Sequence, residues 1–343
     1  MRKTLTAFVA LAAALTISAC SNDADSALSG SSADASGQST DSGSGSSGDV
    51  ESLKVATMSI ADLGAYFYAL DSGLFTKYGV NVQNVDATAG SAAIASMMSG
   101  DVDLAYSGTD GAVKAGENGL AIKIVAGAGG NQPTGDKDSA GLVVAPGITE
   151  ASQLEGKTLA TMALGNVNQV YAQRWLKDQG VDVSTVKFVE IPSSEQVAAL
   201  ESGEIQGTIL PEPFASQALA NGCTIIGWPW RTGVDNSTLV SVWVASEATL
   251  TGKSNAVKKF LAAMEEATDY ANDSAHRQQI VDAILSHTKL TSDVANNMTF
   301  VKWTEDPDPA KIKEVAQNLV DFGVLDSMPD VDSMVDISLL PSN

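Results

Sequence analysis

The sequence is poor in basic residues and cysteine, and each shortage excludes a class of function. Lys and Arg number 20 against 41 Asp and Glu among 343 residues, which gives a formal net charge of −21 at pH 7. Nucleic-acid binding depends on a basic surface that releases counterions, so we expect no nucleic-acid partner. Two cysteines, Cys20 and Cys223, cannot build a disulfide framework or a Cys-rich metal cage.

The usual material of enzyme active sites is also scarce. His276 and His287 are the only histidines, which leaves little for His-dependent catalysis. No Walker A or HExxH sequence occurs, and residues 127–132 begin like a GxGxxG loop but carry Gln in the sixth position. We therefore expect no enzyme: no catalytic residues, no metal and no cofactor.

The first twenty residues read as an export signal. Residues 1–4 are positively charged, and residues 5–17 form an apolar run that is too short to span a membrane. Small residues then lead into Cys20, a pattern that resembles the lipobox of bacterial lipoproteins. This resemblance implies a signal peptide over 1–19 and lipidation of Cys20, typically with palmitate. An ordinary secretory signal that is cleaved near Ala19 is the alternative interpretation.

A polar segment follows the cysteine. Residues 21–49 are almost entirely Ser, Gly, Asp and Ala, without Lys, Arg or an aromatic residue. Such a composition cannot bury enough apolar surface to fold, so residues 20–50 are expected to be a flexible tether. About thirty residues of this kind span roughly 30 Å. The expected location is the extracytoplasmic face of a bacterial cell membrane, with the lipid as anchor.

The rest of the chain repeats one pattern of strands and helices. The chain is 44% apolar, which is ample for a core, and strands are expected over 53–58, 80–85 and 102–106 with helices over 64–75 and 91–99 between them. The same βαβαβ order recurs in strands 157–161, 186–191 and 205–210 and helices 167–179 and 194–202. We therefore predict an α/β fold of two similar lobes.

Two further strands are expected to join the lobes. Apolar runs over 142–145 and 239–245 can cross from one lobe to the other and form a hinge beside a cleft. The predicted boundaries are 51–146 for the first part of lobe 1, 147–238 for lobe 2, and 239–343 for the return to lobe 1. The last part is expected to contain four helices, over 255–272, 275–286, 292–301 and 309–322.

Small polar residues follow the strands of both βαβαβ units. In open α/β sheets, ligands bind beyond the carboxyl ends of the strands, near helix N-termini. Ser, Thr and Asn are also ordinary helix caps, so each single residue has a structural alternative. Glu212 either accepts a ligand hydrogen bond or caps the next helix. Tyr66 either contacts a ligand or lies in the core, and Arg231 with residues 228–230 lines the rim or packs inside.

Several motifs together resemble a known family. Residues 67–75 and 78–82, the Ala-Gly-Ser-Ala-Ala run at 89–93, residues 98–105, residues 154–160 and the Pro-Glu-Pro-Phe run at 211–214 carry the resemblance. They are similar to motifs of the nitrate, sulfonate, taurine and thiamine-precursor group of ABC-importer substrate-binding proteins. The likeness extends over most of the chain beyond residue 53.

This resemblance implies a type II periplasmic-binding-protein fold and the delivery of a small polar solute by hinge closure. The partners would be the solute and the permease subunits with their cytoplasmic ATPase, and the protein would be a monomer. In this family the ligand contacts come from the loops after the strands. In this sequence they correspond to Asp62, Tyr66, Gly90, Ser91, Ser107, Thr109, Asn166, Asn168 and Glu212.

Two departures from the family pattern bear on the ligand. Asp62 stands where many members carry Gln, Asn or Thr, and Leu210 replaces an aromatic residue. If Asp62 and Glu212 both face the cleft, a ligand with N–H groups is favoured over nitrate or a sulfonate. Two other functions are considered: an enzyme like those of thiamine-pyrimidine synthesis, which share the fold, and a sensor lipoprotein that does not transport.

Overall fold

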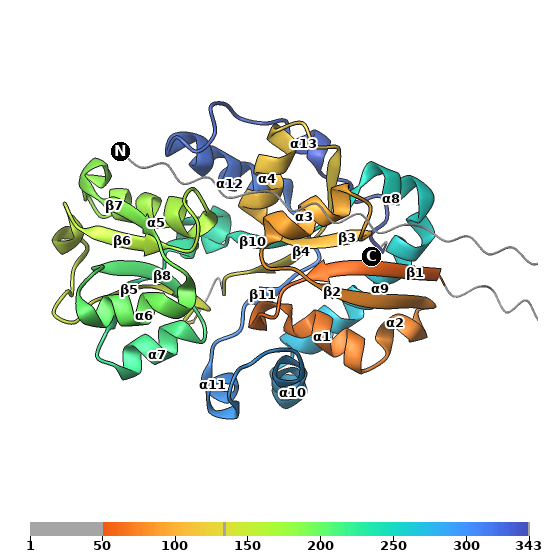
Figure 1. Ribbon diagram of the computed structural model, residues 1–343, viewed down its shortest axis with the longest axis horizontal. Helices are drawn as coiled ribbons and strands as arrows, with labels where there is room; N and C mark the ends of the chain where they lie inside the picture. Colours follow the sequence, from red (N-terminus) through yellow and green to blue (C-terminus); the bar gives the residue numbers. More distant parts are fainter. Residues whose placement is uncertain (1–50, 133–134, 342–343) are drawn as a thin grey trace, which may run out of the picture. The chain divides into compact units, whose positions relative to one another are not determined.

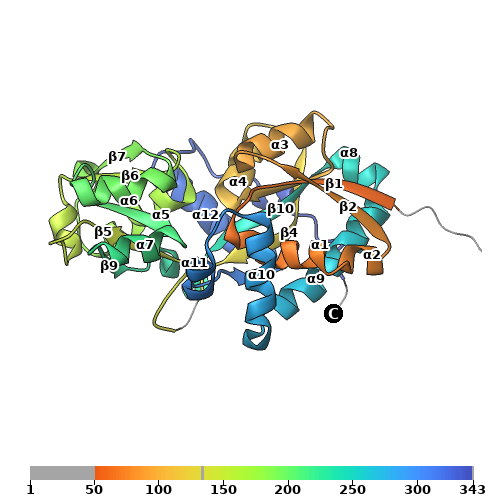
Figure 2. The ribbon, with the colours of Figure 1, turned by 60° about the horizontal axis from the view of Figure 1, so that its bottom comes forward.

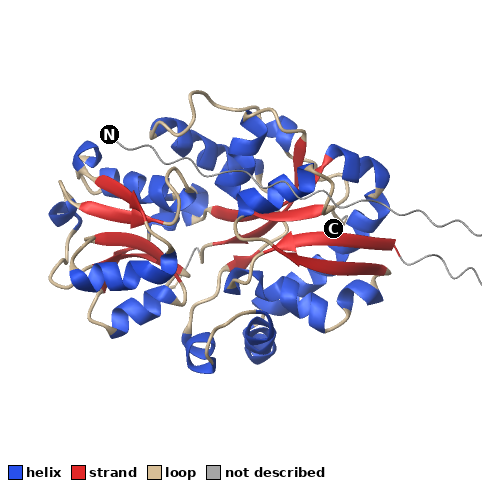
Figure 3. Ribbon diagram, in the orientation of Figure 1, coloured by secondary structure: helices blue, strands red, loops and turns tan. Residues whose placement is uncertain are grey.

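The computed structural model describes residues 51–132 and 135–341, which form two β-sheets with helices on their faces (Figure 1, Figure 3). The predicted signal peptide, Cys20 and the tether lie outside these residues. The first sheet has six strands in the order β11-β4-β10-β3-β1-β2. These strands are β1 (Glu51–Thr57), β2 (Val80–Asp86), β3 (Leu104–Gly108), β4 (Ile122–Gly130), β10 (Leu239–Ser246) and β11 (Lys302–Trp303).

The second sheet has five strands in the order β7-β6-β8-β5-β9. They are β5 (Ala140–Val144), β6 (Thr158–Thr161), β7 (Lys187–Glu190), β8 (Gly207–Pro211) and β9 (Thr224–Gly227). Both sheets are parallel where β1, β2 and β3, or β6, β7 and β8, pair with one another. In each, an antiparallel strand then follows: β10 beside β3, and β5 beside β8.

Helices cover both faces of each sheet and supply the core. In the first sheet, one face packs against α1, α9 and α10, and the other against α3, α4 and α12. In the second sheet, α5 covers one face and α6 with α7 the other. The bounds are α1 (Gly64–Asp71), α2 (Leu74–Lys77), α3 (Gly90–Met98), α4 (Thr109–Glu117), α5 (Val167–Asp178), α6 (Ser193–Ser202), α7 (Phe214–Ala220), α8 (Glu247–Gly252), α9 (Ser254–Asn272), α10 (Arg277–His287), α11 (Ser292–Asn297), α12 (Pro309–Asp321) and α13 (Val331–Met334).

The helix α9 shows why the sequence forms these elements. Its buried residues recur every three or four positions, as in Val257, Phe260, Leu261 and Met264, so one stripe of the helix faces the sheet. The ring of Phe260 stacks on that of Phe75 with centroids 5.2 Å apart. Burying a side chain of this size stabilises the fold by about 1.5–3 kcal/mol.

The predicted α/β fold with two βαβαβ units is confirmed, and most element bounds lie within two residues of the prediction. The helix expected over 64–75 is broken, because Gly73 has a left-handed backbone with φ of 75° and separates α1 from α2. The helix expected over 292–301 ends at Asn297. Strands β4 and β9 were not predicted, and the glycine-rich run 127–130 lies in β4 rather than in a loop.

The connections between the sheets differ from the prediction. Strand β5 pairs with β8 and β9 in the second sheet, and β10 pairs with β3 and β4 in the first. The chain therefore crosses before β5 and before β10. We call residues 131–139 the first crossing segment and residues 228–238 the second. The predicted lobe boundary after residue 146 lies past the actual crossing, because an apolar run does not indicate which sheet it joins.

The C-terminal helix α12 touches both halves. It packs against α4 of the first sheet and against α5 of the second (Figure 2). We use lobe 1 for the first sheet with its helices and lobe 2 for the second sheet with α5, α6 and α7. Across residues 51–132 and 135–341, none of the helices combines the length and the apolar character needed to cross a membrane.

Candidate ligand site between the two sheets

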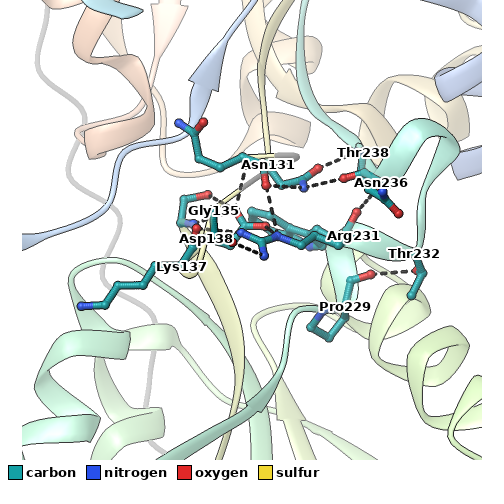
Figure 4. A network of polar contacts seen from close by, with 12 residues as sticks. Asn131, Gly135, Lys137, Asp138, Pro229, Arg231, Thr232, Asn236 and Thr238 are labelled. Carbon is teal, nitrogen blue, oxygen red and sulfur yellow. Dashed lines mark hydrogen bonds and ion pairs between the residues drawn. The ribbon is translucent and has the colours of Figure 1, made fainter. Parts of the chain in front are cut away.

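The two crossing segments are tied together by Arg231 (Figure 4). Its guanidinium donates to the carbonyl oxygens of Gln132, Gly135 and Lys137 at 2.7–3.1 Å, all on the first crossing segment. It also pairs with the carboxylate of Asp138 at 3.3 Å, and that side chain is fully buried. The hydrogen bonds of Arg231 therefore go to backbone carbonyls and to Asp138 of the protein itself. Its guanidinium joins the two crossing segments, which differs from the predicted role at the rim of the cleft.

Asn131 and Thr238 add a second connection between these segments. The side-chain oxygen of Asn131 accepts from the backbone N–H of Thr238 at 2.6 Å, and its amide group donates to the carbonyl of Asn236 at 3.0 Å. The hydroxyl of Thr238 donates to the carbonyl of Trp230 at 2.7 Å. All of these contacts lie within the two crossing segments, which join the lobes (Figure 4). We call the two crossing segments together the pivot.

The lobes also meet directly beside α4. Lys114 pairs with Asp110 at 3.0 Å within this helix, and its ammonium donates to the carbonyl of Gly165 in lobe 2 at 3.1 Å. Farther along, Arg174 of α5 donates to the side chain of Asn318 on α12 at 3.2 Å. These contacts therefore join lobe 1 to lobe 2 at α4 and at α12.

Several predicted ligand residues have structural hydrogen bonds. Asn166 caps α5, since its side chain accepts from the N–H of Gln169 at 2.9 Å and from the hydroxyl of Thr161 at 2.7 Å. Thr109 is fully buried, and its hydroxyl donates to the carbonyl of Leu239 at 2.7 Å. Glu212 accepts from the N–H and the hydroxyl of Ser216 at 3.1 and 2.9 Å, which places it in the capping role for α7.

Gly90, Ser91 and Ser107 lie where α3 and α4 begin. A Cβ on Gly90 would come within 2.8 Å of the Ser107 hydroxyl, so glycine is needed for the close approach of α3 to β3. Ser107 is buried, whereas Ser91 is exposed in the first turn of α3. Of these three, Ser91 is the one whose side chain is free to reach outward.

Tyr66 lies in the core, as one of its two predicted interpretations required. It is 1% exposed and packs against Phe75, Trp243 and Phe260. Its hydroxyl reaches the sheet and donates to the side-chain oxygen of Asn84 at 3.0 Å. That oxygen also accepts from the hydroxyl of Thr57 at 2.6 Å, and the Asn84 amide donates to Asp86 at 3.1 Å.

Asp62 occupies a different environment from the other predicted residues. It lies in the short helix η1 (Ala61–Leu63) after β1, and its backbone carbonyl accepts from the indole N–H of Trp303 at 2.6 Å. Burial raises the pKa of its carboxyl group to about 6, although the residue keeps partial access to solvent. Within the described residues, its carboxylate has no hydrogen-bonding or ionic partner.

Tyr106 lies near enough to Asp62 to feel its charge, and Ser241 lies on the strand next to that of Tyr106. Burial and the charge of Asp62 raise the pKa of Tyr106, and a hydrogen bond with Ser241 opposes this shift. The two residues come from neighbouring strands, β3 and β10, with Ser241 two residues before Trp243, the partner of Tyr106 in the sheet. Sequence reasoning did not single out either residue, because both lie inside strands. The sequence offered one signal for Ser241: it is a polar residue within the otherwise apolar strand β10.

Asn168 is the remaining predicted residue. It is 8% exposed, and in the part of the chain that the structure describes its side-chain oxygen is buried without a hydrogen-bond partner. The hydroxyl of Tyr171, one turn later on α5, is in the same state. Among the described residues, the predicted set is therefore divided between residues with structural roles and three whose side chains have unused hydrogen-bonding capacity: Asp62, Ser91 and Asn168.

Two hollows of the described surface lie apart from Asp62. One of about 270 Å³ is on the surface between α1 and α10, lined by residues such as Tyr68 and Asp282. The other, of about 240 Å³, is lined by both crossing segments, β11 and the first turn of α12, including Lys302 and Lys311. Trp303, whose indole N–H donates to the backbone carbonyl of Asp62, also lines this second hollow. Over 51–132 and 135–341, no group of three or more His, Cys, Asp or Glu is placed to hold a metal ion.

Comparison with known proteins agrees with this architecture. A protein of Brachyspira hyodysenteriae named as an ABC transporter periplasmic binding protein is 25% identical over 239 residues, which cover 66% of this chain and 67% of that protein. The structure of the periplasmic aliphatic sulphonate binding protein of Escherichia coli is similar with a TM-score of 0.69 and 16% identity, over 83% of this chain and 92% of the other.

The periplasmic nitrate-binding protein of Synechocystis PCC 6803 is similar with a TM-score of 0.68 and 14% identity, over 85% of this chain and 87% of the other. These likenesses confirm the predicted two-lobed type II periplasmic-binding-protein fold. The model of the NMT1-like family matches residues 46–285, a span that includes the parallel strands of both sheets and both crossing segments. The chain therefore belongs to the NMT1-like family.

Proposed function

We propose that this protein is the extracytoplasmic solute-binding component of an ABC importer. It would capture a small polar solute between its lobes and deliver it to the permease subunits, which a cytoplasmic ATPase drives. The observation that carries the proposal is the family match over residues 46–285, since it spans both lobes and the pivot between them. The named function of the Brachyspira hyodysenteriae relative points the same way.

The mechanism we propose is hinge closure. The crossing segments 131–139 and 228–238 are short, and the hydrogen bonds of Arg231 and Asn131 hold them as one pivot. Rotation about that pivot, on a timescale of microseconds to milliseconds, would bring the loops of lobe 2 onto a solute held by lobe 1. The closed, liganded form would then dock productively on the permease. In this proposal the protein performs no catalysis.

The membrane attachment is part of the same proposal. Cys20 would carry the lipid, residues 1–19 would be removed as the signal peptide, and residues 20–50 would serve as the tether. The Cys20 motif and the polar composition of residues 21–49 support this arrangement. An anchored protein stays close to its permease while its folded part can reorient.

A thermal-shift panel tests the proposal directly. Nitrate, alkanesulfonates, taurine, alkylamines, amidines and aminopyrimidines would each be added to the purified folded chain, and hits would be measured by titration calorimetry. A solute at 100 times its Kd should stabilise the protein by roughly 2.7 kcal/mol. Binding of one solute class without turnover supports the proposal.

Two outcomes would oppose it. Chemical conversion of a bound solute, detected by mass spectrometry, would indicate an enzyme. Binding without any change in small-angle scattering would indicate a sensor that holds its ligand without closing. Import of the labelled solute by cells that carry the protein, lost when it is deleted, distinguishes transport from sensing.

A further inference from the structure

We propose, on the basis of the proposed function, that the captured solute carries an apolar body, which Ile60 of lobe 1 and Met162 and Leu164 of lobe 2 cover when the lobes close. Such a solute differs from nitrate, for which the Synechocystis neighbour is named. The proposal concerns the body of the solute and leaves the charge of its head group open. It rests on a motif that both lobes repeat and on the exposure of the apolar side chains in it.

The two βαβαβ units repeat five residues at the end of their first strand. Residues 56–60 read Ala-Thr-Met-Ser-Ile, and residues 160–164 read Ala-Thr-Met-Ala-Leu. Thr57 ends β1 and Thr161 ends β6, and in each sheet this strand is the middle one of the three parallel strands. The two runs therefore occupy equivalent places in the two lobes.

The threonine of each run is buried and fixes the loop that follows it. The hydroxyl of Thr57 donates to the side-chain oxygen of Asn84 at 2.6 Å, and that of Thr161 donates to the side-chain oxygen of Asn166 at 2.7 Å. Neither threonine is more than 2% exposed. The two lobes therefore share the anchor of the loop as well as its sequence.

The apolar side chains that follow these threonines are exposed. Ile60 is 36% exposed, Met162 52% and Leu164 55%, and none of the three belongs to an apolar cluster of the described residues. A single exposed apolar residue is common on a protein surface, but exposed apolar residues at equivalent places of two lobes indicate a surface that is covered in another state.

The position of these loops identifies the solute as what covers them. In open α/β sheets, ligands bind beyond the carboxyl ends of the parallel strands, where both runs stand. The second loop also touches lobe 1, because the carbonyl of Gly165 accepts from Lys114 of α4 at 3.1 Å. A Cβ on Gly165 would lie 2.9 Å from a methyl carbon of Val324, just after α12. The loop of lobe 2 is therefore already seated against lobe 1 beside the exposed side chains.

An unpartnered polar group in the same loop is a second observation that points to a ligand. Asn168, at the start of α5, is 8% exposed, and its side-chain oxygen has no hydrogen-bond partner over residues 51–132 and 135–341. A buried acceptor without a donor is unfavourable, and an N–H or O–H group of the solute would satisfy it. Residues 58–63 and 162–168 contain neither Lys nor Arg, so these two loops offer the solute apolar contact without positive charge.

Chain length in two homologous series tests the apolar body. Methylamine, butylamine and hexylamine form one series, and methanesulfonate, butanesulfonate and hexanesulfonate form the other. Each compound is titrated calorimetrically into the folded chain. In the series whose head group binds, affinity should rise about fourfold per methylene from methyl to butyl, which corresponds to about 0.8 kcal/mol for each buried CH₂.

Matched leucine variants separate this role from general surface hydrophobicity. Leu164→Ser should lower the affinity of the hexyl compound at least fivefold. Leu120→Ser is the control, because Leu120 is 41% exposed and precedes β4, at the edge of the sheet away from the strand ends where the loops lie. It should change that affinity less than twofold, while circular dichroism checks that both variants are folded.

Oxidation of methionine gives a readout that needs no variant. Hydrogen peroxide transfers one oxygen atom to the thioether of an accessible methionine, which becomes a sulfoxide while the peroxide becomes water. Peptide mass spectrometry follows each site. A saturating solute should slow the oxidation of Met162 at least fivefold. Met98, which is 37% exposed at the end of α3, should be oxidised at an unchanged rate.

The outcomes distinguish the apolar assignment from the proposed function. Affinity that does not rise with chain length, equal losses in Leu164→Ser and Leu120→Ser, or unchanged oxidation of Met162 under a saturating solute overturns the assignment but leaves the solute-binding function intact. Binding of nitrate in the wider panel without binding of either alkyl series has the same meaning. If no compound binds, here or in the wider panel, the proposed function itself fails and the assignment fails with it.

Discussion

At the scale of single residues, the acidic side chains after the strands differ in whether they have a hydrogen-bonding or ionic partner. Glu212 and Asp110 have partners within one helical turn, whereas the carboxylate of Asp62, which keeps partial access to solvent, has no partner among the described residues and burial raises its pKa to about 6. A charged group in that state destabilises the unliganded fold, and binding sites commonly carry such a cost. Two predictions concern these residues.

The first prediction concerns stability and pH. The pKa of Asp62 is raised from 3.8 to about 6 in the fold, so the folded state binds its proton more tightly than the unfolded state. The stability from this group is therefore present below the unfolded pKa and is lost as pH rises through about 6. Asp62→Asn should stabilise the unliganded protein by about 2 kcal/mol at pH 7.5 and by much less at pH 4.

Urea denaturation at both pH values measures this difference. Asp86→Asn serves as the control, because Asp86 is exposed at the end of β2. An equal effect of Asp62→Asn at pH 4 and pH 7.5 would contradict the assigned environment of Asp62.

The second prediction concerns Glu212. Because its carboxylate accepts from both the N–H and the hydroxyl of Ser216, Glu212→Ala should cost about 1 kcal/mol of stability through the lost cap. Affinity for the bound solute, measured by calorimetry, should change less than twofold. A tenfold loss of affinity without a loss of stability would instead place Glu212 in the binding site.

At the scale of elements, the pivot depends on one buried ion pair between two segments that lie far apart in the sequence. Arg231 comes from the second crossing segment and Asp138 from the first, and the Arg231 guanidinium also satisfies three backbone carbonyls. Removing one partner of such a pair is more damaging than its net contribution implies, because the other charge stays buried.

The third prediction follows from this pair. Arg231→Ala should destabilise the protein by about 3 kcal/mol in chemical denaturation, since it leaves the Asp138 carboxylate buried and unpaired. Adding Asp138→Asn to that variant should recover part of the loss, which a double-mutant cycle measures. Lys313→Ala, which breaks an exposed pair with Asp332, should cost less than about 0.5 kcal/mol. Equal costs for Arg231→Ala and Lys313→Ala would show that the pivot pair has no special role.

At the scale of the whole molecule, the proposed function requires the lobes to move and the chain to stay near its permease. The contacts between the lobes beside α4 and along α12 include two polar ones, Lys114 with Gly165 and Arg174 with Asn318, and an apolar cluster that α4, α5 and α12 share. The polar contacts exchange with water at small cost, whereas rotation about the pivot requires the apolar contacts to rearrange.

The fourth prediction is that the bound solute draws the lobes together. Dyes on Ser99→Cys and Ser202→Cys, both exposed and one on each lobe, should show a change in energy transfer with the solute that binds. Cys223 is 5% exposed and should not be labelled. Binding without any change in transfer would oppose hinge closure.

The fifth prediction concerns the anchor. Cys20→Ser should move the protein from the membrane fraction to the soluble fraction of a bacterial host, and it should abolish labelling with a palmitate analogue. Solute affinity of the folded part should stay within twofold of the wild type. Retention of the label in Cys20→Ser would place the lipid elsewhere or exclude it.

The sequence by itself determined the elements and the fold class. The period of buried residues in α9, the glycines that end helices, and the repeated βαβαβ order are local patterns that depend on neighbours three or four residues away. Such patterns are readable without the fold. The family motifs added the two-lobed arrangement, which the strand order then confirmed.

Only the tertiary structure decided where the chain crosses between lobes and which acid is left without a partner. An apolar run such as 140–144 fits either sheet, and its pairing with β8 depends on residues more than sixty positions later. Asp62 and Glu212 both stand after a strand, yet Glu212 has a local partner in Ser216, four residues later, whereas Asp62 has no partner among the described residues. Strand pairing and the surroundings of Asp62 are set by packing across the chain, so no local pattern predicts them.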